Sequence, residues 1–160
     1  MDRRVKTLVG ALALFAVIIA AVLIGQSGGD DEGDTPAEGE KPTVEVPEGD
    51  PPKELEIEDL EEGEGAEAQP GDQLTVDYVG VLYDTGDEFD ASYDRGEPFQ
   101  FVLGQGGVIP GWDEGLEGMK AGGRRQLVIP PDLGYGAQGQ PPDIPPGATL
   151  VFVIDLVAIN

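Results

Sequence analysis

The chain lacks cysteine and histidine altogether, and it has only two serines among its 160 residues. Without cysteine there is no disulfide bond, no thiol nucleophile and no attachment point for a lipoprotein anchor. Without histidine there is no Ser-His-Asp triad, and a zinc site built from imidazole or thiolate ligands is excluded as well. Any chemistry must depend on carboxylates, tyrosine hydroxyls, arginine, backbone groups or the shape of a pocket.

Positive charge is also scarce. Nine lysines and arginines stand against 32 acidic residues, which gives a formal net charge of −23. This charge disfavours binding to nucleic acid or to an anionic membrane surface, so no nucleic-acid partner is expected. The acidic residues are concentrated in residues 26–70, which carry 17 of them and two lysines.

The N-terminus has the pattern of a membrane anchor. Arg3, Arg4 and Lys6 precede an uncharged apolar run over residues 7–25. This run is about as long as a membrane-spanning helix requires and longer than the apolar core of a typical signal peptide. An uncleaved anchor is favoured, and a cleaved signal remains the alternative. The basic residues predict a cytoplasmic N-terminus, which would place the rest of the chain on the extracytoplasmic side of the cell membrane as a single-pass protein.

Residues 26–52 are rich in glycine, proline and acidic residues and poor in large apolar ones. Such a composition predicts a disordered, self-repelling linker. Within it, the acidic cluster at residues 30–34 lacks the spacing and the closing glutamate of an EF-hand calcium loop, so a solvated linker is favoured over a metal site. Neither a metal nor a cofactor is expected.

The folded domain is expected over residues 53–160, where apolar and polar residues alternate with the period of a β-strand. Strands are predicted at five segments and around Leu55 and Ile57; the five are residues 73–83, 88–92, 97–103, 124–129 and 149–159. The last segment is apolar on both faces, which is typical of a central strand. The expected fold class is α+β, with an antiparallel sheet of five or six strands wrapped around one short helix.

That helix is predicted after Pro110. Ile109, Trp112, Leu116 and Met119 recur at helical spacing, and glycines end the pattern at residues 122–123. Trp112 is the only tryptophan, and the helix would carry its indole into an apolar interior. These residues alone favour ordinary core packing over the floor of an apolar pocket.

Residues 53–160 closely resemble the FKBP-type peptidyl-prolyl cis–trans isomerases. The shared motifs occur in the family's order and at nearly its spacing. They are Val76-Asp77-Tyr78-Val79-Gly80, Glu88-Phe89-Asp90-Ala91-Ser92, Pro98-Phe99-Gln100-Phe101, Val108-Ile109-Pro110-Gly111-Trp112-Asp113-Glu114-Gly115, Gly134-Tyr135-Gly136, Ile144-Pro145-Pro146 and Thr149-Leu150-Val151-Phe152. The resemblance implies an FKBP-like fold and an enzyme that accelerates rotation about X–Pro bonds. A non-catalytic proline-peptide binding module or a folding chaperone of the same fold is the alternative.

The resemblance also implies site residues. Four would be catalytic: Tyr78, Asp90, Tyr135 and Phe152. Seven would bind substrate: Phe89, Arg95, Phe99, Val108, Ile109, Trp112 and Ile144. Trp112 would lie beneath the proline ring, and the Tyr135 hydroxyl with the backbone N–H of Ile109 would contact substrate carbonyls. Without the resemblance, the strand aromatics would be interpreted as core, and Asp90 with Arg95 as a surface ion pair.

The sequence departs from the family pattern at the rim of this pocket. Gln140 stands near a position where some members carry histidine, and Asp143 precedes Ile144 where a well-known relative has an apolar residue. The implied partners are proline-containing unfolded or exported polypeptides and FK506-type macrolides. The protein is expected to be a monomer.

Overall fold

The computed structural model describes residues 40–160. The predicted membrane anchor over residues 1–25 and the first part of the predicted linker lie outside the described residues. Within residues 40–160, no helix is long and apolar enough to cross a membrane.

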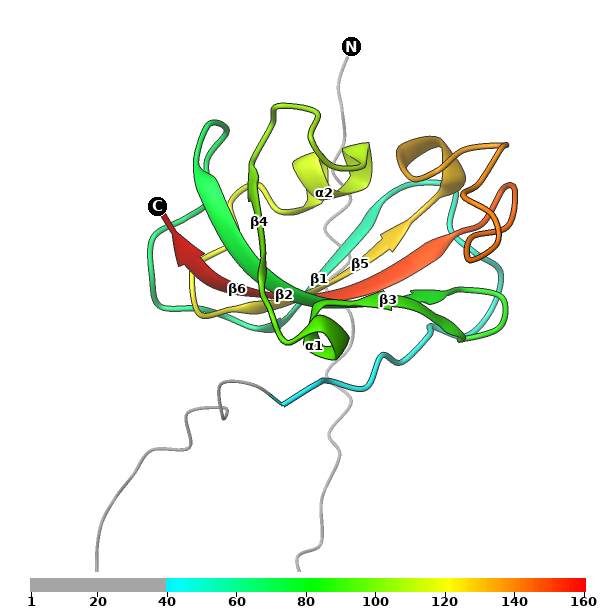
Figure 1. Cartoon of the computed structure of the whole chain (residues 1–160), viewed down its shortest axis with the longest axis horizontal. Coiled ribbons are helices and arrows are strands. Elements are labelled where there is room, and N and C mark those ends of the chain that lie inside the picture. Colours follow the sequence, from blue (N-terminus) through cyan, green and yellow to red (C-terminus); the bar gives the residue numbers. More distant parts are fainter. Residues whose placement is uncertain (1–39) are drawn as a thin grey trace, which may run out of the picture. The chain divides into compact units, whose positions relative to one another are not determined.

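One antiparallel sheet of six strands forms the scaffold (Figure 1). The strands are β1 (Glu56–Glu61), β2 (Gln73–Leu82), β3 (Glu88–Ala91), β4 (Phe99–Val102), β5 (Arg124–Ile129) and β6 (Leu150–Ile159). Their order is β1-β5-β6-β2-β3, and β4 pairs with the first part of β2. The prediction of five or six antiparallel strands is confirmed, and so is the central place of the last strand, because β6 pairs with both β5 and β2.

Within residues 40–160, three short helices accompany the sheet: α1 (Ser92–Arg95), α2 (Pro110–Gly115) and the 3-10 helix η1 (Pro131–Leu133). Figure 1 shows α2 on one side of the curved sheet and α1 on the other. Only α2 was predicted, because α1 and η1 are single turns and too short to show a helical period in the sequence.

The predicted helix is shorter than its pattern suggested. It ends at Gly115, although helical spacing continued to Met119. The reason is Gly118, which adopts a left-handed φ of 80° and donates its N–H to the carbonyl of Ala68 at 2.8 Å. Leu116 and Met119 are still buried, so the apolar spacing correctly marked the core and wrongly extended the helix.

Alternation along the strands divides the buried residues between the two faces of the sheet. On the α2 face lie 16 buried residues: Ala68, Leu74, Val76, Tyr78, Phe101, Leu103, Trp112, Leu116, Met119, Leu127, Ile129, Ile144, Leu150, Phe152, Ile154 and Leu156. On the opposite face lie six: Val79, Val81, Tyr83, Ala91, Val128 and Val151. We call these the front cluster and the back cluster.

The back cluster is covered by residues 41–50, which we call the strap. Val44 and Val46 of the strap are partly buried against this cluster. Figure 1 shows the segment passing on the side of the sheet away from α2. These residues lie within the predicted linker, residues 26–52, and the structure places them against the sheet. The two alternating valines bury apolar surface on the sheet, and this burial offsets the entropy lost on ordering the segment.

The far end of the strap is held by a tyrosine of the sheet face. The Tyr83 hydroxyl lies 3.3 Å from the carbonyl oxygens of both Gly49 and Asp50 and donates its proton to this pair. Tyr83 itself is buried in the back cluster. The strap is thus fixed by apolar contacts in its middle and by hydrogen bonding at its end.

Candidate active site

Trp112 is the centre of an aromatic group on the front face. Its side chain is 4% exposed, and three neighbouring rings approach it edge-on. Ring centroids lie 5.0 Å away for Tyr78, 5.3 Å for Phe152 and 6.1 Å for Phe99, with interplanar angles of 76–84°. These rings come from β2, β6 and β4, so the sheet supplies the rings that surround the indole and α2 supplies the indole itself. Edge-to-face contacts of this kind are a favourable aromatic geometry.

Two glycines let α2 lie directly on β5. A Cβ atom at Gly111 would lie 2.6 Å from Cγ2 of Ile129, and one at Gly115 would lie 2.7 Å from Cδ1 of Leu127. Real Cβ atoms do not approach other atoms this closely, so a side chain at either position would push the helix away from the strand. The glycines thereby set the depth at which Trp112 is held.

Arg125 holds the C-terminal end of the same helix. Its Nη1 donates to the carbonyl oxygens of Gly115 at 2.9 Å and Glu117 at 3.3 Å. Its Nε donates to Oδ1 of Asp59 at 2.6 Å, so the side chain ties α2 to the edge strand β1. Sequence reasoning missed this role, since nothing in the pattern of β5 indicates which carbonyls its arginine meets.

The indole nitrogen of Trp112 is buried and has no hydrogen-bond partner among residues 40–160. A buried donor without a partner is unfavourable by about 1–3 kcal/mol.

A third glycine makes room for the pair of phenylalanine rings. A Cβ atom at Gly80 would lie 2.6 Å from ring atoms of both Phe89 and Phe152. The two rings meet edge-on with centroids 5.4 Å apart. Gly80 therefore lets Phe89 pack from β3 over the centre of β2.

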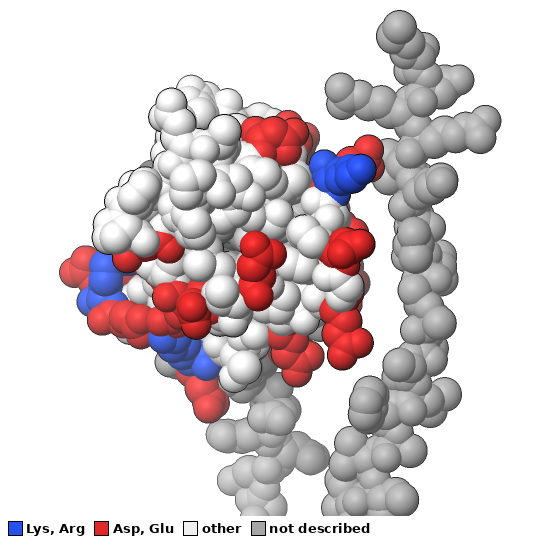
Figure 2. Space-filling view, turned by 90° about the vertical axis from the view of Figure 1, so that its right-hand side faces the viewer, with Lys and Arg blue, Asp and Glu red and all other residues white. Residues whose placement is uncertain are grey.

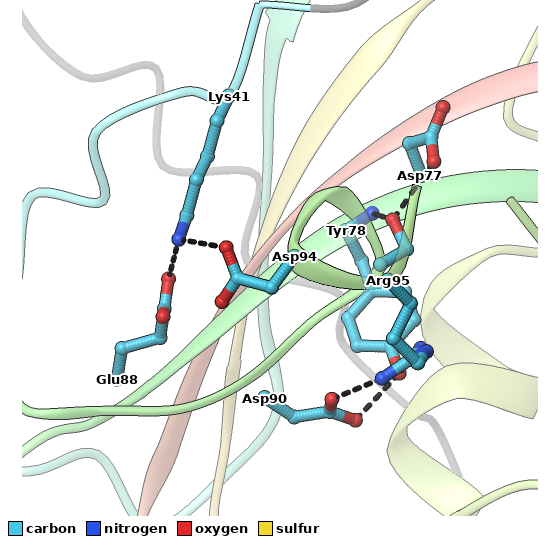
Figure 3. A network of polar contacts seen from close by, with 8 residues as sticks. Lys41, Asp77, Tyr78, Glu88, Asp90, Asp94 and Arg95 are labelled. Carbon is cyan, nitrogen blue, oxygen red and sulfur yellow. Dashed lines mark hydrogen bonds and ion pairs between the residues drawn. The ribbon is translucent and has the colours of Figure 1, made fainter. Parts of the chain in front are cut away.

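The polar edge of the site is a closed triangle of Tyr78, Asp90 and Arg95. The Tyr78 hydroxyl donates to Oδ2 of Asp90 at 2.5 Å, and Nη1 of Arg95 donates to Oδ1 of the same carboxylate at 2.5 Å. Nη2 of Arg95 donates to the Tyr78 oxygen at 2.8 Å, and its guanidinium carbon lies 5.6 Å from the centroid of the Tyr78 ring. Figure 3 shows Asp90 and Arg95 meeting beside the Tyr78 ring.

This arrangement keeps Tyr78 neutral. Burial, and then the hydrogen bond to Asp90, raise the pKa of Tyr78 to about 12, against an opposing effect of Arg95. The phenol therefore keeps its proton across the physiological pH range and acts as a hydrogen-bond donor, not as a base.

A buried serine fixes the backbone beneath Tyr78. The Ser92 hydroxyl accepts the N–H of Tyr78 at 2.9 Å and donates to Oδ1 of Asp77 at 2.8 Å. Ser92 is fully buried at the start of α1. Sequence reasoning quoted Ser92 and Asp77 as motif residues without giving them this role. The available signal was that one of only two serines falls inside a matched motif.

The structure brings the nominated residues together. Eight belong to the front cluster or pack against it: Tyr78, Phe89, Phe99, Val108, Ile109, Trp112, Ile144 and Phe152. Asp90 and Arg95 join them through Tyr78. Tyr135 is 36% exposed, and its pKa is raised by partial burial and by the charge of Asp90. The roles implied for these residues in catalysis and binding stay predictions.

A separate cavity of about 170 Å³ lies at the other end of α2. Its lining includes six charged side chains: Asp59, Glu61, Glu62, Glu67, Lys120 and Arg125. Such a lining does not suit an apolar proline ring. In the part of the chain that the structure describes, no group of three or more acidic side chains is placed to hold a metal ion.

Comparison with known families identifies the domain. The sequence model described as "FKBP-type peptidyl-prolyl cis-trans isomerase" matches residues 64–157. This chain belongs to that family. The match includes Trp112, the triangle at its polar edge and the strands that carry the aromatic walls, so the FKBP-type domain and the candidate site coincide.

Named relatives agree with the family. The chain is 56% identical over 121 residues to an FK506-binding protein of Streptomyces anulatus, covering 75% of this chain and 98% of the relative. It is 54% identical over 94 residues to the peptidyl-prolyl cis-trans isomerase FKBP15-2 of Arabidopsis thaliana, covering 59% and 57% of the two chains. The crystal structure of AtFKBP13 superposes with a TM-score of 0.63 at 40% identity, covering 69% of this chain and 96% of that one. The chain is thus an isomerase of the FKBP type.

Proposed function

We propose that this FKBP-type domain accelerates X–Pro rotation by seating the proline ring on Trp112 within the aromatic walls. The single observation that carries the proposal is the edge-on arrangement of Tyr78, Phe99 and Phe152 around that indole. These rings present an apolar surface immediately beside one polar edge, which suits an apolar ring attached to a polar amide.

The chemistry requires no nucleophile. The barrier to rotation about a peptide bond is about 18–20 kcal/mol because resonance favours the planar amide. In the twisted amide this resonance is lost and the carbonyl is less polar. A dry aromatic site therefore disfavours the planar ground state relative to the twisted state, which lowers the barrier. A chain without cysteine and histidine is sufficient for this mechanism.

Polar groups would hold the rotating amide in place. The Tyr78 proton is already donated to Asp90, so in this proposal the donors to substrate carbonyls are the Tyr135 hydroxyl and the backbone N–H of Ile109. Tyr135 is the most exposed of the site aromatics, and the carbonyl of Ile109 accepts the N–H of Trp112 at 2.9 Å at the start of α2. The peptide would thus be oriented by groups on both sides of the ring.

An isomerase assay on the full 160-residue chain with a proline-containing peptide tests the proposal. Wild-type protein is expected to accelerate cis–trans exchange, and Trp112→Leu and Phe152→Leu are expected to lower kcat/KM at least tenfold. Lys120→Met is the control, since it removes a partly exposed cation that pairs with Glu62 and touches none of the aromatic rings. A folded wild-type chain that binds the peptide without accelerating exchange would overturn catalysis and leave the binding-module alternative.

Ligand and location are part of the same proposal. Relatives named as FK506-binding proteins support an FK506-type macrolide as a competitive ligand of the aromatic site, which a competition assay measures. The apolar run at residues 7–25 supports a membrane-anchored isomerase acting on exported polypeptides. Protease added to intact cells is expected to cleave the domain in such a protein, and full protection would contradict this location.

A further inference from the structure

The β3–α1 segment, residues 88–95, supplies three of the nominated residues: Phe89, Asp90 and Arg95. Near its two ends stand two other carboxylates, Glu88 and Asp94. One lysine contacts both of them. Nζ of Lys41 lies 2.5 Å from Oε1 of Glu88 and 2.8 Å from Oδ1 of Asp94. Figure 3 shows the Lys41 side chain extending from the strap to Glu88 and Asp94, near the triangle of Tyr78, Asp90 and Arg95.

Lys41 belongs to an anchored piece of chain. It precedes Val44 and Val46, which pack on the back cluster, and the end of the strap is bonded to Tyr83. Its side chain is 37% exposed. Because the strap backbone is held by these contacts, the ammonium group loses less freedom on pairing than that of a lysine on a mobile loop.

Lys41 compensates an excess of negative charge in the β3–α1 segment. Residues 88–95 hold three carboxylates and a single cation of their own, Arg95. Asp94 is adjacent to Arg95 in sequence, and its pKa is lowered by Lys41 first and also by the charge of Arg95. Asp94 is therefore a competing partner for the arginine that the site uses. An unneutralised Asp94 would draw the guanidinium away from Tyr78 and Asp90.

We propose that Lys41 is a positioning residue for the active site, because neutralising Glu88 and Asp94 leaves Arg95 to Tyr78 and Asp90. This inference rests on the proposed function of the aromatic site, and it adds a residue from outside the matched family region, which begins at residue 64. Through Lys41, the strap connects the chain segment that precedes the domain to the polar edge of the site.

The expected effect is modest because the pairs are partly exposed and screened by solvent. Exposed ion pairs are individually weak, and losing two of them corresponds to a fall in kcat/KM of about two- to fivefold. The assay must therefore compare matched variants and not rely on one substitution.

The decisive set of variants is made in the full chain. Lys41→Met is expected to lower kcat/KM about two- to fivefold, and Lys41→Arg to restore it. Lys120→Met is the matched control: Lys120 is also 37% exposed and pairs with Glu62 at 2.9 Å, away from the triangle. The triple variant Lys41→Met, Glu88→Gln, Asp94→Asn is expected to recover wild-type kcat/KM, since the competing carboxylates are gone with the lysine.

The rescue separates positioning from general stability. If Lys41 only stabilised the fold, removing its partners as well would not restore activity, and Lys120→Met would lower kcat/KM as much as Lys41→Met. Either result overturns the proposal, and so does an unchanged kcat/KM in Lys41→Met. High salt is expected to reduce the difference in kcat/KM between wild type and Lys41→Met, because it screens both the pairs of Lys41 and the attraction of Asp94 for Arg95. A difference that does not change with salt would overturn the electrostatic origin.

A measurement that needs no turnover keeps this proposal distinct from the isomerase mechanism. The guanidinium N–H signals of Arg95 are observed by nuclear magnetic resonance and assigned by their loss in Arg95→Lys. They are expected to exchange with solvent faster in Lys41→Met than in wild type or the triple variant. Equal exchange in all of them overturns the role of Lys41, whatever the isomerase assay shows.

Discussion

The two faces of the sheet are both apolar, and they differ in what covers them. The back cluster consists mainly of valines, and the chain closes it with its own strap valines, Val44 and Val46. The front cluster contains the aromatic rings, and its outer members Phe89 and Phe99 are only partly buried. The strap covers the aliphatic back face, whereas two rings of the front face stay partly exposed. The proposed binding site thus lies on the face that the chain leaves partly uncovered.

The largest expected effect comes from filling the front face. Gly80→Val places side-chain atoms where Phe89 and Phe152 now lie, since even a Cβ atom would approach them to 2.6 Å. We expect a loss of about 1–3 kcal/mol in unfolding free energy and a drop in kcat/KM of at least tenfold. Denaturant unfolding and the peptide assay measure these. Gly107→Ala, which meets no atom within 4 Å, is the control, and equal effects of both variants would contradict the packing argument.

The next largest effect on stability is expected from replacing Arg125, which holds the C-terminal end of α2 beneath the front face. Arg125→Met leaves the carbonyls of Gly115 and Glu117 without this donor and Asp59 without its cation. We expect the unfolding free energy to fall by about 1–3 kcal/mol. We also expect KM to rise, because Trp112 is held less rigidly. Quenching of Trp112 fluorescence by acrylamide checks the second point. Unchanged quenching with lowered stability would limit Arg125 to a purely structural role.

A smaller effect is expected from uncovering the back face. Val44→Ser with Val46→Ser loosens the strap and loses about 1–2 kcal/mol of unfolding free energy, because these side chains are only partly buried. The loss of activity is expected to be no greater than in Lys41→Met, since the aromatic site lies on the other face. A loss of tenfold or more would show that the two faces are coupled through the sheet and not only through Lys41.

The smallest effect is a pH dependence shared by one tyrosine from each face. Burial is the main cause that raises the pKa of Tyr78 on the front and of Tyr93 on the back, and each hydroxyl donates to an aspartate. A raised pKa in the folded state means that stability is unaffected by these groups below about pH 10, the unfolded value, and falls as pH rises above it. Tyr78→Phe and Tyr93→Phe are each expected to flatten the decline above pH 10. If the unfolding free energy began to fall below pH 9, the fall would have an origin other than these two tyrosines.

The membrane anchor stays a prediction, because residues 1–25 lie outside the described residues. The same holds for the extracytoplasmic location that depends on it.

The sequence was more informative about the domain. The alternation in residues 124–129 marked β5 with its observed ends, and the apolar pattern on both faces of residues 149–159 correctly identified the central strand.

By itself, the sequence determined which face each strand residue occupies, which family the chain belongs to and that Trp112 enters an apolar interior. Periodicity encodes the faces of the strands and the burial of Trp112 locally, whereas the spaced motifs carry the likeness to the family. Only the tertiary structure decided which distant residues meet. Lys41 and Asp94 are 53 positions apart, and Arg125 and Asp59 are 66 apart. Such pairs depend on strand register and on where the strap crosses the sheet, and a local pattern carries no record of either. For that reason the composition of residues 26–52 did not indicate that Val44 and Val46 pack on the back cluster.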